Sequence, residues 1–316
     1  AIISANRLRK QKHLWTDNGR GDPVVVHEAY NEQDEALFVV REIDRLVHRG
    51  QAAYRDFAVL FRTNAQSRAL EDAFVRRGLP YRLVGGTRFY QRKEVKDVLA
   101  YLRLAHNPYD TVSLNRVINV PPRGIGTKTL AELERWAAKR GLSLGEAALH
   151  LADEGSASGD LPLGGRGRSA LTGFGSLLRD LVAAKAEATV LELLDLALDR
   201  SGYARYVQDG SEEGEDRWRN IMELRTKARD YEQLRGPEAL ASFLEEVSLV
   251  QEVDGLDGEG DAVTLITLHQ AKGLEFPYVF IVGFEEGLCP HARSLDDAAQ
   301  MEEERRLCYV GITRAM

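Results

Sequence analysis

Cysteine is scarce in this sequence, and long apolar runs are absent. The 316 residues contain two cysteines, Cys289 and Cys308, whose spacing matches no metal-binding pattern. Two isolated thiols favour a reducing cytoplasm over a disulfide-linked scaffold. No apolar stretch approaches the ~18 residues that a membrane-spanning helix needs, and the first residues lack the pattern of a secretory signal. We therefore expect a cytoplasmic protein without membrane segments.

An excess of basic residues is also absent. Lysine and arginine number 42 against 49 aspartates and glutamates, so the formal net charge is -7. Composition therefore gives no support to nucleic-acid binding, and any contact with DNA would need basic groups gathered locally. Hydrophobic residues make up 44% of the chain, which is enough for folded cores and excludes a disordered protein.

A phosphate loop for ATP is a third absence. The stretch PPRGIGTKTL, residues 121–130, comes nearest to one. Such a loop needs Gly, four residues and then Gly-Lys-Ser/Thr, between a strand and a helix. Here Thr127 precedes Lys128, the earlier glycine is missing, and two prolines break any incoming strand. No acidic pair follows a buried strand, so no motif that would hold Mg²⁺ is visible either, and we expect no metal site.

The same stretch has the features of a helix-hairpin-helix. Arg123-Gly124-Ile125-Gly126 would form a tight turn between helical patterns at Ser113–Asn119 and Thr127–Arg140. Glycines allow close backbone approach, and exposed N–H groups at a helix N-terminus attract anions. One function for the turn is to hold a DNA phosphate backbone without reading sequence. The alternative is a plain helix–helix turn.

Strand and helix patterns alternate over residues 1–106, which is typical of an α/β domain. Glycines at the ends of two helical patterns, Gly50 and Gly78, can serve as left-handed stops. The predicted strands are Pro23–Tyr30, Asp56–Phe61 and Tyr81–Val84, and the predicted helices are Glu32–Arg49, a helix capped by Thr63 or Asn64 that runs to Arg77, and Lys93–Ala105.

Helical patterns dominate residues 107–260, with loops expected at Leu151–Arg168 and Gln251–Asp261. Strands return at Val263–Leu268 and Tyr278–Gly283, and a helix rich in Glu and Arg follows. The economical interpretation is one α/β domain in two parts, residues 1–106 and 261–316, interrupted by a helical insertion at 107–260.

Several longer stretches resemble motifs of the superfamily 1A DNA helicases, the UvrD, PcrA and Rep family. The matching stretches, in family order, are AVLFRTNAQSR (Ala58–Arg68), GGTRFYQRKEVKDVLAYLRL (Gly85–Leu104), VINVPPRGIGTKTL (Val117–Leu130), TLITLHQAKGLEFPYVFIVGFEEGLCPHARS (Thr264–Ser294) and EEERRLCYVGITRA (Glu302–Ala315). The resemblance is weakest over residues 150–250.

The resemblance implies two RecA-like motor domains, 1A and 2A, each with an inserted domain, 1B and 2B. This chain resembles 2A with a mostly helical 2B inserted, so domains 1A and 1B, with the phosphate loop, are expected to precede Ala1 in a longer protein. The implied activity is ATP-dependent 3′ to 5′ DNA unwinding in repair or replication. ATP and Mg²⁺ would be bound mostly by domain 1A.

The resemblance also implies roles for individual residues. Arg314 would be the arginine that stabilises the transferred phosphate, a catalytic role. The other implied ATP contacts are Lys272, Gly273 and Glu275. The implied contacts to single-stranded DNA are Arg62, Asn64, His269 and His291, and those to a DNA duplex or junction are Arg123, Gly124, Ile125, Gly126, Thr127 and Lys128. Arg305 and Arg306 are expected to pair with nearby glutamates.

Two other functions remain open at this point. The first is a non-catalytic DNA-binding or protein-interaction module that keeps the helicase fold. The second is the helicase part of a helicase–nuclease, which would need a nuclease motif beyond Met316. A phosphate loop in the sequence before Ala1 would favour the motor over the non-catalytic module.

We predict that the isolated chain has no ATPase activity, because no group in it can hold Mg²⁺ and the β-phosphate together. The measurement is phosphate release in the presence of saturating single-stranded DNA. A turnover of about 1 s⁻¹ or more, which is within the usual range of enzymes, would contradict this prediction.

Overall fold

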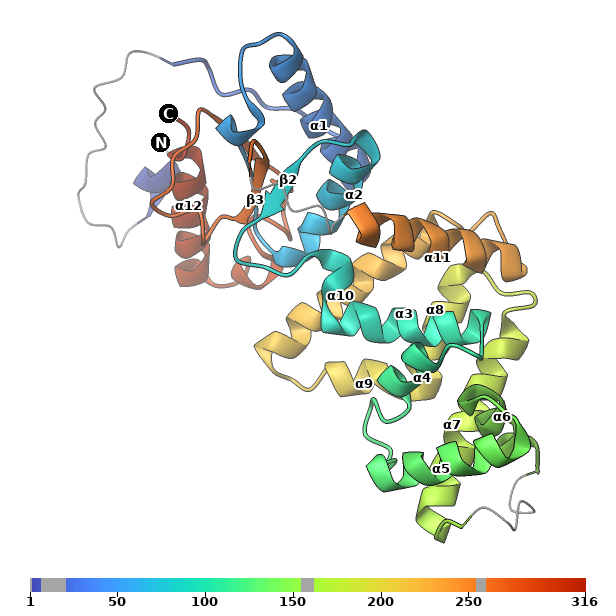
Figure 1. Cartoon of the computed structure of the whole chain (residues 1–316). Helices are drawn as coiled ribbons and strands as arrows, with labels where there is room; N and C mark the ends of the chain where they lie inside the picture. Colours follow the sequence, from blue (N-terminus) through green and yellow to red (C-terminus); the bar gives the residue numbers. More distant parts are fainter. Residues whose placement is uncertain (1, 7–20, 155–161, 254–259) are drawn as a thin grey trace. The chain divides into compact units, whose positions relative to one another are not determined.

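The computed structural model describes residues 2–6, 21–154, 162–253 and 260–316 (Figure 1). The chain divides into two compact units. Residues 1–89 and 252–316 form the first, which we call the α/β unit, and residues 90–251 form the second, the helical unit.

Four parallel strands form the sheet of the α/β unit, in the order β2-β3-β1-β4. Their bounds are β1 (Phe57–Phe61), β2 (Tyr81–Leu83), β3 (Val263–Thr267) and β4 (Tyr278–Ile281). The two central strands, β1 and β3, are fully buried along their length. A strand covered on both faces must be apolar throughout, which explains the continuous run in β1. The buried polar residues of the central strands are Thr264 and Thr267 of β3, and the charged side chains predicted as ligand contacts lie beyond the strand ends.

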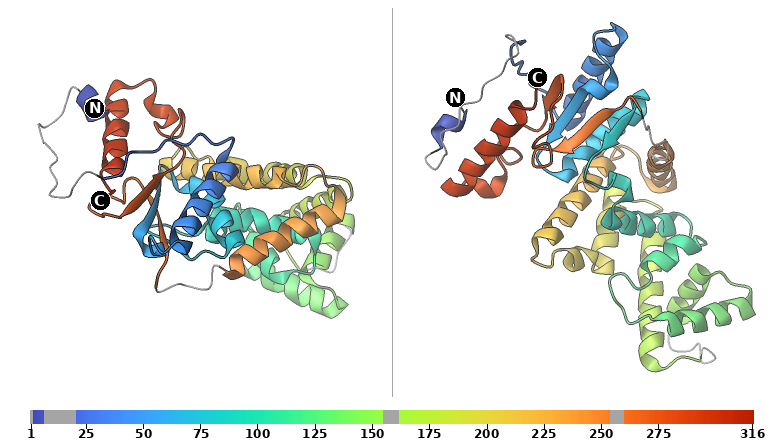
Figure 2. Two further views of the ribbon diagram at one scale, coloured as in Figure 1. Left: turned by 90° about the horizontal axis from the view of Figure 1, so that it is seen from above. Right: turned by 60° about the vertical axis from the view of Figure 1, so that its left-hand side comes forward.

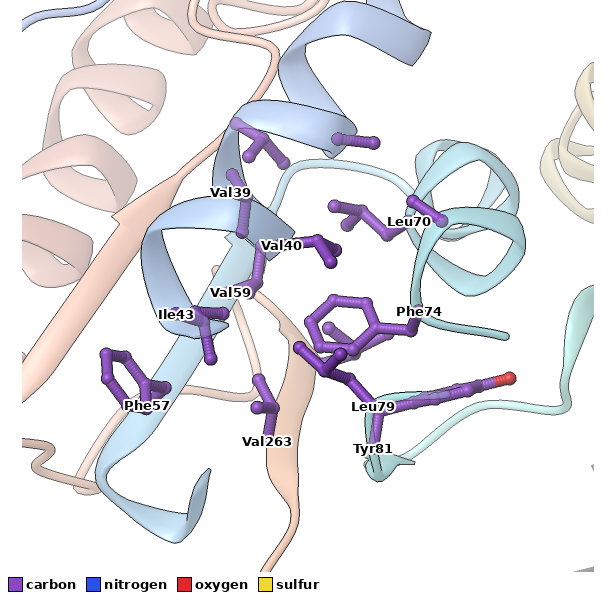
Figure 3. Close-up of a cluster of buried hydrophobic side chains, with 14 of the residues drawn as sticks. Val39, Val40, Ile43, Phe57, Val59, Leu70, Phe74, Leu79, Tyr81 and Val263 are labelled. Atoms are coloured by element: carbon purple, nitrogen blue, oxygen red, sulfur yellow. The ribbon is translucent and has the colours of Figure 1, made fainter. Parts of the chain in front are cut away.

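Helices cover both faces of this sheet (Figure 2). On one face, α1 (Glu32–His48) and α2 (Ser67–Arg77) pack against the strands. Figure 3 shows Val40 and Ile43 of α1 and Phe74 of α2 pointing toward Val59 of β1. Asn31 caps α1 by accepting a 2.8 Å hydrogen bond from the backbone N–H of Asp34, which satisfies one of the donors left open in the first turn.

The opposite face is covered by α12 (Ala298–Ile312) and by the segment that precedes β4. Gly311 lies where α12 meets the strands. A β-carbon at this position would lie 2.5 Å from Cδ2 of Leu268 and 3.2 Å from Cδ1 of Ile281. The helix therefore approaches the sheet closely at Gly311 because no side chain intervenes.

The helical unit contains no strand in its described residues. Its helices are α3 (Lys93–His106), α4 (Thr111–Val117), α5 (Thr127–Arg140), α6 (Leu144–Glu154), α7 (Gly165–Ala184), α8 (Val190–Ser201), α9 (Tyr203–Val207), α10 (Glu212–Arg229) and α11 (Gly236–Val253).

Short 3₁₀ helices in the described parts of the chain are η1 (Ile2–Ala5), η2 (Tyr54–Asp56), η3 (Asn64–Gln66), η4 (Phe89–Gln91) and η6 (Ala292–Ser294). Among the helices in the described ranges, none is both long and apolar enough to cross a membrane.

A buried polar group holds α3 to its neighbours in the helical unit. Asp97 accepts a 2.7 Å hydrogen bond from the Tyr203 hydroxyl and lies 2.7 Å from Nε of Arg116. Burial, followed by the charge of Asp97, raises the pKa of Tyr203. The tyrosine therefore stays protonated and remains a donor to the carboxylate.

Most predicted elements are confirmed, but three predictions need correction. Pro23–Tyr30 is not a strand: it has no strand pairing, and Val24, Val25 and Val26 are each at least 80% exposed. Their β-branched side chains favour extended backbone, but a strand also needs a hydrogen-bonded neighbour. The predicted loop at Leu151–Arg168 is also partly wrong, because α6 extends to Glu154 and α7 begins at Gly165. Its middle lies outside the described residues. The predicted loop at Gln251–Asp261 is wrong at its start, because α11 extends to Val253, and most of the rest of it lies outside the described residues.

The boundaries between the units differ from those expected at residues 106 and 260. The two compact units divide between Phe89 and Tyr90 and between Gln251 and Glu252. The cause is α3, which packs with α4, α7, α8 and α10 of the helical unit. Its amphipathic pattern predicts a helix but does not identify the partners of its apolar face.

We predict that Gly311→Val destabilises the α/β unit by about 1–3 kcal/mol, the usual cost of overpacking. Gly173→Val is a suitable control, since Gly173 also lies in a helix but a β-carbon there has no neighbour within 4 Å. Urea unfolding of both variants would measure the difference. Equal stability of the two variants would show that α12 does not pack closely at Gly311.

Candidate functional site

The carboxyl edge of the sheet carries most of the predicted single-stranded DNA contacts. Arg62 follows β1 and His269 lies two residues after β3, and parallel pairing of these strands places both at the same edge. In open α/β sheets this is the edge where ligands bind. Asn64 is exposed there, and a β-carbon at Gly86 would lie 3.6 Å from its Oδ1. The segment after β2 therefore belongs to the same edge.

Arg62 forms a two-pronged ion pair with Glu304 of α12. Its Nε lies 3.0 and 3.1 Å from the two carboxylate oxygens, and its Nη2 lies 2.7 Å from Oε1. The backbone N–H of His291 donates a 3.0 Å hydrogen bond to the same carboxylate. Burial raises the pKa of Glu304, but the hydrogen bonds from Arg62 and His291 outweigh this effect, so that its pKa is lowered. Glu304 is therefore charged at neutral pH.

Two glutamines hold the backbone of this edge. Oε1 of Gln66 accepts hydrogen bonds from the backbone N–H groups of Arg62 and Thr63, at 3.0 and 2.9 Å. Nε2 of Gln270 donates a 3.0 Å hydrogen bond to the carbonyl oxygen of Gly85. The bond of Gln270 links the segments that follow β3 and β2, and those of Gln66 close the turn after β1, so the predicted contact residues are carried on fixed backbone.

The two histidines of this edge differ in their surroundings. Partial loss of water and then the nearby charge of Arg62 lower the pKa of His269. His269 is therefore largely neutral at pH 7, which suits stacking on a base better than pairing with a phosphate. His291 caps η6, where its Nδ1 accepts a 3.3 Å hydrogen bond from the backbone N–H of Arg293.

Arg314 and the predicted ATP contacts form a second group in the α/β unit. Nη1 of Arg314 donates a 2.8 Å hydrogen bond to the carbonyl oxygen of Leu274, and its Nε donates a 3.0 Å bond to that of Val310. Lys272, Gly273 and Glu275, which flank Leu274, are exposed. The structure thus brings Arg314 beside the segment that carries the three other residues.

The second group suits part of a nucleotide but not a metal ion. The arginine and the lysine can pair with phosphates, and the carboxylate of Glu275 can accept a hydrogen bond from a ribose hydroxyl. For Mg²⁺ the donor set does not fit: in the part of the chain that the structure describes, no group of three or more His, Cys, Asp or Glu side chains could hold a metal ion.

In the helical unit, Arg123 faces inward rather than toward solvent. Its Nη1 donates to the carbonyl oxygens of Val117 and Pro121 at 3.0 and 3.2 Å, and its Nη2 donates to the Tyr101 hydroxyl at 2.7 Å. These contacts tie the end of α4 to α3 and hold the turn in place. We therefore assign Arg123 to positioning the turn, together with the buried Ile125.

The rest of the predicted hairpin is open to solvent. Gly124 has a φ of +80°, which favours glycine, and Gly126 is the N-cap of α5. Thr127 and Lys128 are exposed, and the first turn of α5 has no acidic residue. The start of α7 lies close by, since a β-carbon at Gly167 would lie 3.5 Å from Cγ2 of Thr129. This surface can accept an anion.

The sequence alone missed Glu304, Gln66 and Gln270 as members of the site. Glu304 is one of three consecutive glutamates, and only the fold distinguishes it, because Glu303 is exposed and pairs with Arg306 at 2.7 Å. The prediction that Arg306 is an ion-pair partner is confirmed. Gln66 closes a Thr-x-x-Gln capping box with Thr63, a local pattern that could have identified it, whereas no local pattern shows that Gln270 bonds to the distant Gly85.

Known proteins match the chain over nearly its whole length. Residues 1–153 and 176–316 match the family described as UvrD-like helicase C-terminal domain. The ATP-dependent DNA helicase UvrD1 of Mycobacterium tuberculosis (strain ATCC 25618 / H37Rv) is 42% identical over 332 residues, which cover 100% of this chain and 42% of that protein. The ATP-dependent DNA helicase PcrA of Bacillus subtilis (strain 168) is 41% identical over 321 residues, 99% of this chain and 42% of that protein. The chain thus spans less than half the length of these relatives.

We predict that Lys128→Ala weakens binding of this chain to a duplex–single-strand junction and lowers the salt slope by roughly one counterion. Binding to a plain single strand should change little. Lys139→Ala is the control, because it removes the same charge from the other end of α5. Fluorescence anisotropy at several salt concentrations would measure the DNA affinity of the wild type and of both variants. Equal losses of junction affinity for Lys128→Ala and Lys139→Ala would exclude a specific role for the turn.

Arg123→Ala should act differently, because its bonds are internal. We predict a loss of about 1–3 kcal/mol in the stability of the helical unit, the usual cost of leaving buried partners unsatisfied. The melting temperature should fall, and binding to junction and single strand should decline together. A selective loss of junction binding with unchanged melting would return Arg123 to the DNA contacts.

Proposed function

Because the chain belongs to the UvrD-like helicase C-terminal domain family, we propose that it forms the 2A and 2B domains of an ATP-dependent DNA helicase that moves 3′ to 5′ along a single strand. The relatives that cover the whole chain are named ATP-dependent DNA helicases. The observation that carries the proposal is the position of Arg314, held beside the exposed segment of Lys272, Gly273 and Glu275. These residues supply half of a nucleotide site.

The other half must come from a second motor domain, as domain 1A does in this family. Such a domain would supply the phosphate loop, which this sequence lacks, and the ligands of Mg²⁺, of which the described residues hold no suitable group. ATP hydrolysis supplies the energy for movement when the two halves meet. The chain's own contribution is a planar, permanently charged guanidinium that offsets the charge of the transferred phosphate.

The bonds of Arg314 preorganise its side chain for this task. Its Nε and Nη1 already donate to two backbone carbonyl oxygens, and Nη2 donates to the Thr313 hydroxyl at 3.0 Å. The guanidinium is half-buried and held in one orientation, so little rearrangement is needed during the reaction. Lys272 and Gly273 would lie beside the phosphates, and Glu275 would bind the ribose.

Single-stranded DNA is the proposed ligand of the carboxyl edge. Asn64 can bond sugar or phosphate, while His269 and His291 can stack on bases. Arg62 would pair with phosphate. Its bidentate bond to Glu304 reduces its availability, so we expect its contribution to be weaker than that of an unpaired arginine.

Duplex DNA is the proposed ligand of the hairpin in the helical unit. Its exposed members are Gly124, Gly126, Thr127 and Lys128. The contact would be electrostatic and independent of sequence, because backbone N–H groups and a lysine contact phosphates rather than base edges. Repair and replication both require a protein with these properties. A cytoplasmic location is consistent with two free, buried cysteines.

Substitution of Arg314 tests the proposal. In a protein that carries this chain together with its phosphate-loop domain, Arg314→Ala should reduce DNA-stimulated ATP hydrolysis by roughly 10³- to 10⁵-fold and leave DNA affinity nearly unchanged. Arg306→Ala, which removes a partly exposed arginine from α12, the helix that ends two residues before Arg314, should leave hydrolysis close to that of the wild type. A loss below about tenfold for Arg314→Ala would show that this arginine does not act on the phosphate.

A further inference from the structure

Glu304 is a buried acidic side chain of the carboxyl edge with partners on two other segments. Its side chain is 6% exposed, and that of Arg62 is 20% exposed. The carboxylate of Glu304 therefore connects three elements. It joins α12, to which Glu304 belongs, to the end of β1 through Arg62 and to the turn before η6 through the backbone N–H of His291.

This arrangement has an electrostatic consequence for any anion that approaches the edge. A bidentate arginine–carboxylate pair is close to neutral as a unit, and the pair is partly shielded from water. A phosphate that reaches the exposed part of Arg62 therefore meets the negative charge of Glu304 directly behind it. Among the described residues, the other ionisable side chains near the pair include His269, which is largely neutral, the acidic Glu303, and also His291 and Cys289.

We propose that Glu304 is a restraining counter-ion for Arg62, which orients the guanidinium at the strand edge and keeps its affinity for phosphate low. The inference rests on the proposed function only in the identity of the ligand. The shared chemistry is a phosphate group, which belongs either to the backbone of single-stranded DNA or to a nucleotide. Weak binding suits a protein that must release each phosphate as it moves. Glu304 is thus a positioning residue that acts through Arg62.

The test is Glu304→Gln in this chain, which keeps the shape of the side chain and one acceptor oxygen but removes the charge. Affinity for phosphate should rise by roughly tenfold, because a unit charge of the wrong sign is removed at close range. For single-stranded DNA the magnitude of the salt slope should rise by about 0.7, the value for one additional phosphate contact. A change that is merely structural would lower affinity or leave it unchanged.

Three matched variants make the result specific. Glu303→Gln removes the same charge from the neighbouring, exposed position of α12 and should change affinity much less. Glu304→Asp keeps the charge and should stay near wild type. The gain should also disappear when Glu304→Gln is combined with Arg62→Gln. Melting temperatures would identify any variant that fails to fold; if Glu304→Gln does not fold, Glu304→Ala, which also removes the charge, takes its place.

Two ligands separate the sources of the phosphate. Fluorescein-labelled oligo(dT) reports the DNA backbone, and a fluorescent ATP analogue reports the nucleotide. A gain for oligo(dT) alone supports both the counter-ion and the proposed DNA edge. A gain for the nucleotide alone supports the counter-ion but moves Arg62 from the DNA contacts to the nucleotide site. The counter-ion role is overturned if Glu304→Gln and Glu303→Gln change the affinities for both ligands equally, or if neither variant changes them. In either case, binding of oligo(dT) by the wild-type chain would still support the proposed function.

Discussion

Parallel pairing of β1 between β3 and β4 is the constraint on which the candidate sites of the α/β unit depend. Because all strands run in one direction, their carboxyl ends meet at a single edge, and residues distant in sequence become neighbours there. Helices on both faces leave the central strands mostly apolar, with Thr264 and Thr267 as the buried polar residues of β3. Arg62 and His269 therefore lie at the edge because it is the first place after their strands where a polar side chain can reach water.

The backbone at this edge is held by side-chain amides and carboxylates rather than by strand pairing. Gln66 accepts from two successive N–H groups after β1, and Glu35 of α1 accepts a 2.9 Å bond from the N–H of Gly283 after β4. Burial, together with nearby acidic groups, raises the pKa of Glu35 despite this bond. Such local bonds satisfy the donors that the sheet leaves open, and they also make the edge rigid enough to present ligand contacts.

Three arginines of the same chemistry have three different surroundings. Arg62 is paired with a buried carboxylate, Arg123 donates to the carbonyl oxygens at the end of α4, and Arg314 is held by two carbonyl oxygens with its guanidinium half-buried. A neutral carbonyl orients an arginine without cancelling its charge, whereas a carboxylate does both. The partner, rather than the arginine itself, therefore determines whether charge remains for a ligand.

The sequence by itself was sufficient to predict the family, the α/β fold, the central strands and most helices, because these depend on local periodicity, helix stops and long motifs. Gly50 and Gly78, for example, both adopt the left-handed conformation that ends a helix. Local pattern was not sufficient to predict the structure of Pro23–Tyr30, because a strand requires a hydrogen-bonded partner. It was also not sufficient to assign α3 to a unit, because an apolar helix face does not show which helices pack against it. Only the tertiary structure decided that Glu304 and not Glu303 meets Arg62, and that Arg123 faces inward while Lys128 faces solvent. The physical reason is that burial and charge pairing arise between residues far apart in sequence, here 242 residues for Arg62 and Glu304, and no local spacing records them.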